Sequence, residues 1–291
     1  MTGNRRILII LFGTLVIVMM GFGMVIPLFA FYVKLFSAGG TTLGLLMSSY
    51  AITQFFCAPL WGNLSDRIGR KPVLAVGILG NALSQLWFGL ATQLWMLFAA
   101  RILAGVLSSA TIPTAMAYIG DTTTEDQRGG GMGILGAAMG IGMVIGPGLG
   151  GLLARDSLSH PFFLAAGLSM LALILVIAYL PESLKISDRL QRTQEQDAQL
   201  SFMLRSLRSP IGVLLVVTTL MSFGLTNFES IFSLYALERY AYGPERVGFI
   251  LMLIGLTSAI VQAALTGPLS RSIGEVNILR GSMLVSALGF I

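Results

Sequence analysis

A single carboxylate stands in the middle of a long apolar stretch. Residues 222–237 read SFGLTNFESIFSLYAL, and Glu229 is the only charged side chain among them. A carboxyl group that faces a cavity within a membrane can take up and release a proton, and it attracts cations while it is ionised. The competing interpretation is a structural glutamate that hydrogen-bonds to a neighbouring helix. Glu229 is therefore the first candidate for proton or cation chemistry.

A second isolated charge is Arg101, which begins the apolar segment RILAGVLSSA. An arginine held in lipid costs free energy, so it usually faces a cavity or a partner. The alternative is that its long side chain extends to the nearer membrane surface. The first interpretation predicts an inward-facing guanidinium.

The sequence contains no motif for other kinds of chemistry. It contains no phosphate-binding Gly-Lys-Ser/Thr loop and no Cys/His cluster with metal-ligand spacing, and Cys57 is the only cysteine. The many glycines of residues 129–151 follow no strand, so they do not form a nucleotide loop. We expect neither an enzyme nor a metal site, and no cofactor.

The elements that position these charges are apolar runs. Of the 291 residues, 55% are hydrophobic and 11% are charged, whereas a soluble domain has about 25% charged residues. Runs of about 20 apolar residues indicate transmembrane helices, so the fold class is all-α integral membrane. The eight runs are 7–32, 43–61, 73–91, 94–119, 131–154, 161–180, 211–237 and 246–266. A ninth begins near Ile278 and extends to the last residue, Ile291.

The positive residues predict the orientation. Most of the 18 Lys and Arg residues lie on one side if the N-terminus is cytoplasmic, and Lys34, Arg155, Arg239 and Arg246 lie on the other. This distribution follows the positive-inside rule. The net charge of +5 is thus explained by a lipid bilayer rather than by nucleic acid, and we expect a plasma-membrane protein.

One polar segment divides the chain into two halves. The segment 181–209 is the most polar and is predicted to be a cytoplasmic linker, in part a surface helix, between a six-helix bundle at 1–180 and a partial bundle at 210–291.

Residues 62–74, GNLSDRIGRKPVL, and 267–279, GPLSRSIGEVNIL, share Gly, Leu, Ser, Ile, Gly and Leu in register. Both follow the second span of their half, which indicates a parallel repeat, although two Gly-rich loops can also agree by chance. A repeat of six spans predicts a C-terminally truncated chain, with spans 7, 8 and the start of 9 in its second half.

The first repeat copy resembles the loop between spans two and three of the major facilitator superfamily, G-x-L-[SA]-D-R-x-G-R-[RK]-x-x-[LI]. The resemblance implies the major facilitator fold and a gating motif on the cytoplasmic side. Two glycines would permit a close helix approach and a tight turn. The matching residues are Gly62, Asp66, Arg67, Gly69, Arg70 and Lys71. The resemblance also brings Asp121 of AYIGD into this charge network, with Arg70 as its expected partner; an ordinary charge at a helix end is the alternative.

The fifth apolar run contains glycines four residues apart, which let a second helix pack closely in lipid. One set is Gly136 and Gly140, and the other runs from Gly142 to Gly150. The second set resembles the antiporter signature of the superfamily, G-x-x-x-G-P-x-x-G-G, which implies exchange rather than uniport. The matching residues are Gly142, Gly146, Pro147, Gly150 and Gly151.

The seventh span resembles that of the Gram-positive multidrug/proton antiporters. This resemblance gives Glu229 a role in proton coupling and drug binding, and Arg101, with Gly105 in an R-x-x-x-G motif, is expected to share the proton coupling. Aromatic neighbours could contact cations. The candidate cavity residues are Phe228, Phe232, Tyr235, Gln54 and Asn227. In the competing tetracycline antiporters, acidic residues occupy positions that align here with Val18, Ser84 and Val285.

These observations predict a secondary active transporter. It would export small amphipathic, often cationic drugs in exchange for protons, by alternating access, as a monomer driven by the proton gradient alone. One alternative is another porter of the same fold, for sugars or metabolites. Another is a truncated fragment that does not transport.

Overall fold

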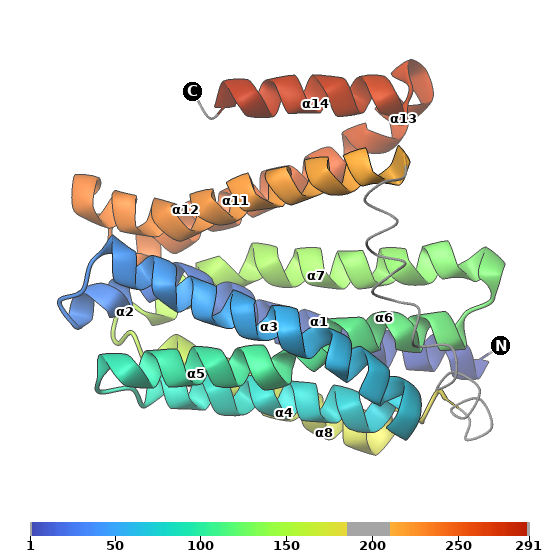
Figure 1. Ribbon diagram of the computed structural model, residues 1–291, viewed down its shortest axis with the longest axis horizontal. Helices are drawn as coiled ribbons and strands as arrows, with labels where there is room; N and C mark the ends of the chain where they lie inside the picture. The colour runs from blue at the N-terminus through green and yellow to red at the C-terminus, as the bar shows by residue number, and fades with distance from the viewer. Residues whose placement is uncertain (1, 185–209, 290–291) are drawn as a thin grey trace.

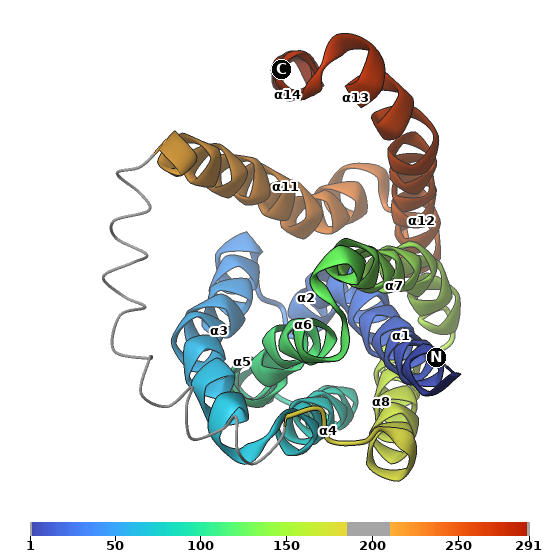
Figure 2. The same ribbon diagram turned by 90° about the vertical axis from the view of Figure 1, so that its right-hand side faces the viewer.

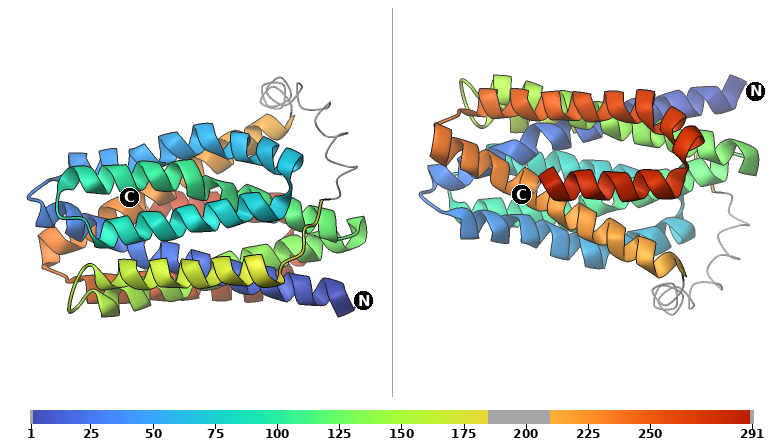
Figure 3. Two further views of the ribbon diagram at one scale, coloured as in Figure 1. Left: turned by 90° about the horizontal axis from the view of Figure 1, so that it is seen from below. Right: turned by 90° about the horizontal axis from the view of Figure 1, so that it is seen from above.

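The computed structural model describes residues 2–184 and 210–289, and within these ranges all regular structure is helical. Eight helical segments are long and apolar enough to cross a membrane, which confirms the eight predicted runs. The first six belong to the N-terminal half and the last two to the C-terminal half. Figure 3 shows most helices running along the long axis of the molecule.

The N-terminal half consists of six spans, two of which are interrupted by 3-10 turns. The first span continues from α1 through a turn that contains Pro27 into α2, since proline has no N–H to donate to a regular helix. The fourth span has a similar turn, Ser108–Ala110. The helices are α1 (Thr2–Val25), α2 (Phe29–Leu35), α3 (Gly40–Ile68), α4 (Arg70–Gly89), α5 (Leu94–Leu107), α6 (Thr111–Thr122), α7 (Glu125–Leu153) and α8 (His160–Tyr179).

α1 lies against α7 and α8, α4 packs between α5 and α8, and α3 lies against α5. Aromatic rings fill the core at the end of the bundle away from the N-terminus. The rings of Phe88 and Phe162 stack with centroids 5.2 Å apart, and Tyr32 meets Phe162 edge-on at 5.0 Å. This packing makes the N-terminal half a rigid support for its inward-facing side chains.

The C-terminal half contains α11 (Pro210–Tyr240), α12 (Pro244–Val261), α13 (Gly267–Ile273) and α14 (Glu275–Gly289), with a π-helical turn, Gln262–Thr266, after α12. Figure 2 shows α13 and α14 on the far side of α11 and α12 from the first six spans. The predicted linker at 181–209, with its surface helix, falls almost wholly outside the described residues and stays a prediction, as do the domain limits.

The two halves meet at one end of the molecule and separate toward the other. Lys34 of α2 forms an ion pair with Glu238 of α11, and Arg155 lies 3.8 Å from Glu245 of α12; both contacts are at the end opposite the N-terminus. From there α11 and α12 diverge from the first six spans (Figure 1). The structure is thus closed at this end and open at the end where the N-terminus lies.

The two copies of the predicted repeat share a backbone feature. Gly69, between α3 and α4, has φ 113°, and Gly274, between α13 and α14, has φ 81°. They occupy the same position in the two copies, and they are the positive-φ glycines of the described residues. Such a conformation is strained for any residue with a Cβ atom, so the repeat is structural and not a chance similarity of two loops.

Candidate functional site

A cavity of about 280 Å³ lies between the two halves. It is bounded by the α1–α2 turn and α7 on one side and by α11 and α12 on the other. Its residues are mostly apolar or small. They are Gly23, Ile26, Pro27, Gly140, Met143, Val144, Pro147, Leu225, Phe228, Glu229, Leu251, Ile254, Gly255, Ser258, Ala259 and Gln262.

Glu229 is the one ionisable side chain among the described residues that line this central cavity. It is partly buried, and no described Lys, Arg or His lies within ion-pair distance of its carboxyl group. Phe228 lines the cavity beside it and lies 5.3 Å from the ring of Phe232. The carboxyl group is therefore available to a proton or to a cation in the cavity.

Four of the predicted cavity residues lie elsewhere in this conformation. Phe232 packs against the hydrophobic core of the closed end, and Tyr235 is 52% exposed. Asn227 is exposed and donates a hydrogen bond to the carbonyl of Phe223, 2.8 Å away. Gln54 is partly buried in α3. None of these four lines the central cavity, so their contact with substrate stays a prediction.

Two polar residues of the cavity were not predicted, Ser258 and Gln262. They are four residues apart near the end of α12 and its π-helical turn, which places them on one side of the helix. Their spacing in an apolar run was the signal that could have identified them.

Arg101 faces inward, as the cavity interpretation of the sequence requires, and the alternative of extension to the surface is wrong. Its side chain is buried, with 6% exposure. The guanidinium carbon lies 4.3 Å from the ring centre of Phe29 and 4.7 Å from that of Tyr50, both within cation–π range. Its Nε atom has no hydrogen-bond partner among the described residues. A small space of about 10 Å³, roughly enough for one water molecule, lies beside it; its lining shares Ile26 with the central cavity and includes Asn81, Ser84 and Gln85.

Gly105 explains how Tyr50 reaches Arg101. A Cβ atom at this position would lie 1.8 Å from Oγ1 of Thr53 and 2.7 Å from the carbonyl oxygen of Tyr50. The glycine thus lets α3 and α5 touch. The R-x-x-x-G spacing therefore holds an aromatic ring over the arginine one turn away.

The predicted gating motif forms a compact charge network around Arg70, which is 2% exposed. Its Nε donates to Asp121 at 3.0 Å and its Nη2 to Asp66 at 2.5 Å. Its Nη1 donates to the hydroxyl of Ser65. The expected contact with Asp121 is present, and Gly69 makes the expected tight turn.

The remaining motif residues contribute less in this conformation. Lys71 donates to the carbonyl of Ile177, 2.8 Å away, and Arg67 is exposed. Gly62 was expected to permit a close helix approach, but no described atom lies within 4 Å of the position that its Cβ would take. That expectation is wrong for this conformation, because Gly62 faces open space, although its neighbour Trp61 donates a hydrogen bond to the carbonyl of Val106 in α5.

Glu182 also belongs to this network and was not predicted. Its carboxylate accepts hydrogen bonds from the backbone N–H groups of Arg70, at 2.8 Å, and Lys71, at 3.2 Å. Gly69 at the N-cap has no side chain to satisfy them, so Glu182 caps α4 from a distant part of the chain. Tyr118 donates to the carbonyl of Pro181, which holds this segment in place. The sequence P-E-S directly after span six, on the side of the motif, was the available signal.

The glycines of α7 form two packing faces. Cβ atoms at Gly142, Gly146 and Gly150 would lie within 2.8 Å of the backbone of α1 between Met19 and Met24, so the predicted close packing is confirmed for these three. Pro147 and Gly151 face α12, where a Cβ atom on Gly248 would be 2.3 Å from the carbonyl oxygen of Pro147.

The other predicted glycine pair does not pack against a helix. At Gly136 and at Gly140, nothing among the described residues lies within 4 Å of the position of an added Cβ. The expectation of close packing there is wrong, because α7 and α12 have separated at this level.

The sequence matches the family described as Major Facilitator Superfamily over residues 11–291. The chain belongs to the major facilitator superfamily.

Two curated relatives span almost all of this superfamily member. Multidrug resistance protein 2 of Bacillus subtilis is 31% identical over 288 residues, which are 98% of this chain and 72% of the relative. The class C tetracycline resistance protein of Escherichia coli is 32% identical over 291 residues, 99% of this chain and 73% of the relative. A bacterial homologue of the human lysosomal transporter Spinster, in an inward-facing, unoccupied conformation, has a TM-score of 0.76 at 15% identity, with 92% of this chain and 62% of that one covered.

The chain is therefore a multi-pass membrane transporter of the major facilitator superfamily and not an enzyme. The chain is about equally identical to its multidrug and its tetracycline relatives. The identity values therefore do not indicate a substrate class, and individual residues must be compared. Of the positions that align with acidic residues of tetracycline antiporters, Ser84 lines the small space beside Arg101, Val18 is buried and Val285 is 71% exposed.

Proposed function

We propose that this transporter exports amphipathic cations in exchange for protons. The observation that carries the proposal is Glu229, the one ionisable group on the described lining of the central cavity. A single carboxylate in an apolar cavity can hold either a proton or a cationic substrate, but not both. Such competition couples the two movements in opposite directions.

The apolar lining favours a lipophilic body on the substrate. Phe228, Met143 and Leu251 supply large or adaptable apolar contacts around Glu229. A magnesium–tetracycline chelate would need further acidic ligands, and the aligned positions hold valine and serine. The proposal therefore favours organic cations over tetracycline, sugars or other polar metabolites.

The transport cycle would alternate between two arrangements of the halves. We place the N-terminus and the open end in the cytoplasm, on the charge distribution of the loops, in the plasma membrane. A cation would enter from that side and bind Glu229, and its release outside would follow when a proton takes its place. The Arg70 network would latch the halves when the cytoplasmic end closes, and Arg101, a fixed positive charge in the small space that adjoins the central cavity, would favour proton release from Glu229. We propose a monomer without a cofactor.

The test is Glu229→Gln in the full chain, reconstituted in proteoliposomes with an imposed pH gradient. We expect gradient-driven export of ethidium to fall at least tenfold, because glutamine cannot exchange a proton. Phe223→Leu, on an exposed side chain of the same helix, should stay within about twofold of the native rate. Retained pH-driven export by the glutamine variant would refute the proposal.

A further inference from the structure

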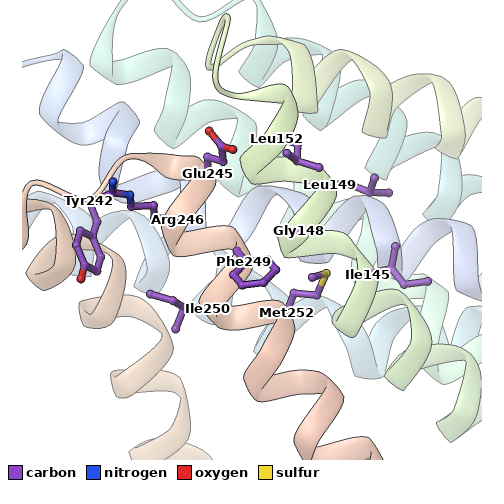
Figure 4. Close-up of a pocket in the computed structure, with 10 residues that line it drawn as sticks. All are labelled: Ile145, Gly148, Leu149, Leu152, Tyr242, Glu245, Arg246, Phe249, Ile250 and Met252. Atoms are coloured by element: carbon purple, nitrogen blue, oxygen red, sulfur yellow. The ribbon is translucent and has the colours of Figure 1, made fainter.

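A groove of about 510 Å³ lies between α7 and α12 at the closed end of the molecule. Figure 4 shows its lining side chains between the two helices. Because α7 belongs to the N-terminal half and α12 to the C-terminal half, the groove spans the boundary between them. The lining residues are Ile145, Gly148, Leu149, Leu152, Tyr242, Glu245, Arg246, Phe249, Ile250 and Met252.

The groove is separate from the central cavity, and the two have no lining residue in common. Pro147 lines the central cavity and its neighbour Gly148 lines the groove. Both residues touch α12. A Cβ atom added to Gly148 would lie 2.5 Å from the sulfur atom of Met252, and one added to Gly248 would lie 2.3 Å from the carbonyl oxygen of Pro147. The two helices therefore meet between these spaces, and the groove has no part in the proposed transport pathway.

The groove is polar at one end and apolar at the other (Figure 4). Glu245 and Arg246 lie in the first turn of α12, where the span meets the membrane surface. Met252 lies about 9 Å further along the helix axis than Arg246, at 1.5 Å per residue. Phe249 and Leu152 are 54% and 56% exposed, and exposed apolar side chains within a membrane face lipid. This order matches a phospholipid, whose charged headgroup lies above its acyl chains.

Arg246 is the unpaired charge of the groove. Its guanidinium carbon lies 5.5 Å from the ring centre of Tyr242, within cation–π range, and no described carboxylate lies within ion-pair distance of it. Glu245 is instead 3.8 Å from Arg155. A guanidinium stacked on an aromatic ring keeps its N–H donors free for a phosphate group. In the proposed orientation both arginines lie on the outer side, where positive residues are uncommon.

We propose that this groove binds one anionic phospholipid from the membrane leaflet at the closed end. The phosphate accepts hydrogen bonds from Arg246, and one acyl chain lies along Phe249 and Met252 between α7 and α12. The ion pair of Glu245 with Arg155 leaves Arg246 as the uncompensated charge, which favours a lipid with a net negative charge over a zwitterionic one. Because both halves line the groove, the site in this form belongs to the arrangement that is closed at this end.

The first test measures binding of the lipid to the whole chain. Native mass spectrometry of the protein released from dodecyl maltoside micelles would count the lipids that remain bound during a titration with phosphatidylglycerol or with zwitterionic phosphatidylethanolamine. The variant is Arg246→Gln. The matched control is Arg239→Gln, an exposed arginine in the last turn of α11 that does not line the groove.

We expect one phosphatidylglycerol to bind at least tenfold more tightly than phosphatidylethanolamine. Arg246→Gln should weaken this binding at least fivefold, and Arg239→Gln should change it less than twofold. Equal binding of the two lipids, or an equal loss in both variants, would overturn the proposal. Inorganic phosphate that competes as well as phosphatidylglycerol would also overturn it, because the acyl chain would then contribute nothing.

A second measurement locates the acyl chain. Phosphatidylglycerol with a photoreactive diazirine in the middle of one chain should label peptides that contain residues 145–152 or 249–252, and Arg246→Gln should lose this labelling. Labelling spread evenly over all membrane-facing helices would contradict a bound lipid in the groove. Neither measurement depends on what the chain exports, so failure here leaves the Glu229→Gln experiment unaffected.

Discussion

The guanidinium of Arg70 donates hydrogen bonds to three side chains, and the carboxylate of Glu182 accepts one from the backbone N–H of Arg70. The buried Arg70 contacts Asp66, Asp121 and Ser65, while its own backbone N–H and that of Lys71 point at the Glu182 carboxylate. Helix α4 begins at this point, and the positive end of its dipole favours an anion there. The segment that leads toward the linker is thus bound to the residues of the gating motif.

Glu182→Ala should destabilise the protein by about 1 kcal/mol, because two backbone donors at the start of α4 lose their acceptor. Glu182→Gln keeps one acceptor oxygen and should lie between alanine and the native residue. Unfolding in mixed detergent micelles, followed by circular dichroism, measures the series. Equal stability of all three proteins would show that water caps the helix equally well.

The charged residues of the site were easier to predict from the sequence than the groups that contact them in the structure. Glu229 and Arg101 are conspicuous because a charge in an apolar run is costly. Glu182 was not recognised, because its partners are backbone N–H groups more than a hundred positions away. Tyr235 and Asn227 share a helix with Glu229, but helical spacing alone does not tell which side of α11 meets the cavity.

The helices of the site are positioned by glycines where they touch and by larger side chains elsewhere. α7 presents Gly142, Gly146 and Gly150 to α1 and Gly151 to α12. In lipid, such close backbone contact supplies much of the attraction between helices. One helix therefore joins the two halves at the closed end.

Gly248→Ala should weaken this closed end. A methyl group there would lie 2.3 Å from the carbonyl oxygen of Pro147, and overpacking of this kind costs about 1–3 kcal/mol. We expect faster passive collapse of a pH gradient in proteoliposomes, as the seal at the closed end loosens. Gly44→Ala, in α3 with no atom within 4 Å, is the control, and a leak equal to that of the control would contradict this role for the contact.

The positions of the helices along the chain could be predicted from the sequence. Which helices pack against each other could be predicted only in part. Runs of apolar residues fixed the spans because the thickness of a bilayer sets their length. The spacing of Gly136 and Gly140 is the same as that of Gly142 and Gly146, yet only the second pair packs against a helix. The difference arises because Gly142 and Gly146 face α1, whereas Gly136 and Gly140 line the space between α7 and α12, and spacing does not encode which neighbour a helix face meets.

At the scale of the whole molecule, the two halves are held together at one end by few polar contacts. Lys34–Glu238 and Arg155–Glu245 are the ion pairs between described residues of the two halves. All four side chains are more than a third exposed, and exposed pairs contribute only about 0.2–1 kcal/mol each. Such weak contacts suit a transporter, because the closed end must open in each cycle.

Lys34→Ala should shift the equilibrium toward arrangements in which this end is open. A loss of up to about 1 kcal/mol corresponds to a change of at most about fivefold in the ratio of open to closed molecules. Spin labels at Thr92→Cys in the N-terminal half and Arg239→Cys in α11, in a Cys57→Ser background, would measure the distance between the two halves by double electron–electron resonance. At low salt, where the Lys34–Glu238 attraction is strongest, the fraction of molecules with the longer distance should be larger in Lys34→Ala than in the native protein. At high salt this difference between the two proteins should shrink. Exchanging the charges, Lys34→Glu with Glu238→Lys, should restore the native distribution. If the distribution responds to neither the substitution nor the salt, apolar contacts alone, those of α7 with α12 and of α11 with the core of the closed end, hold this end closed.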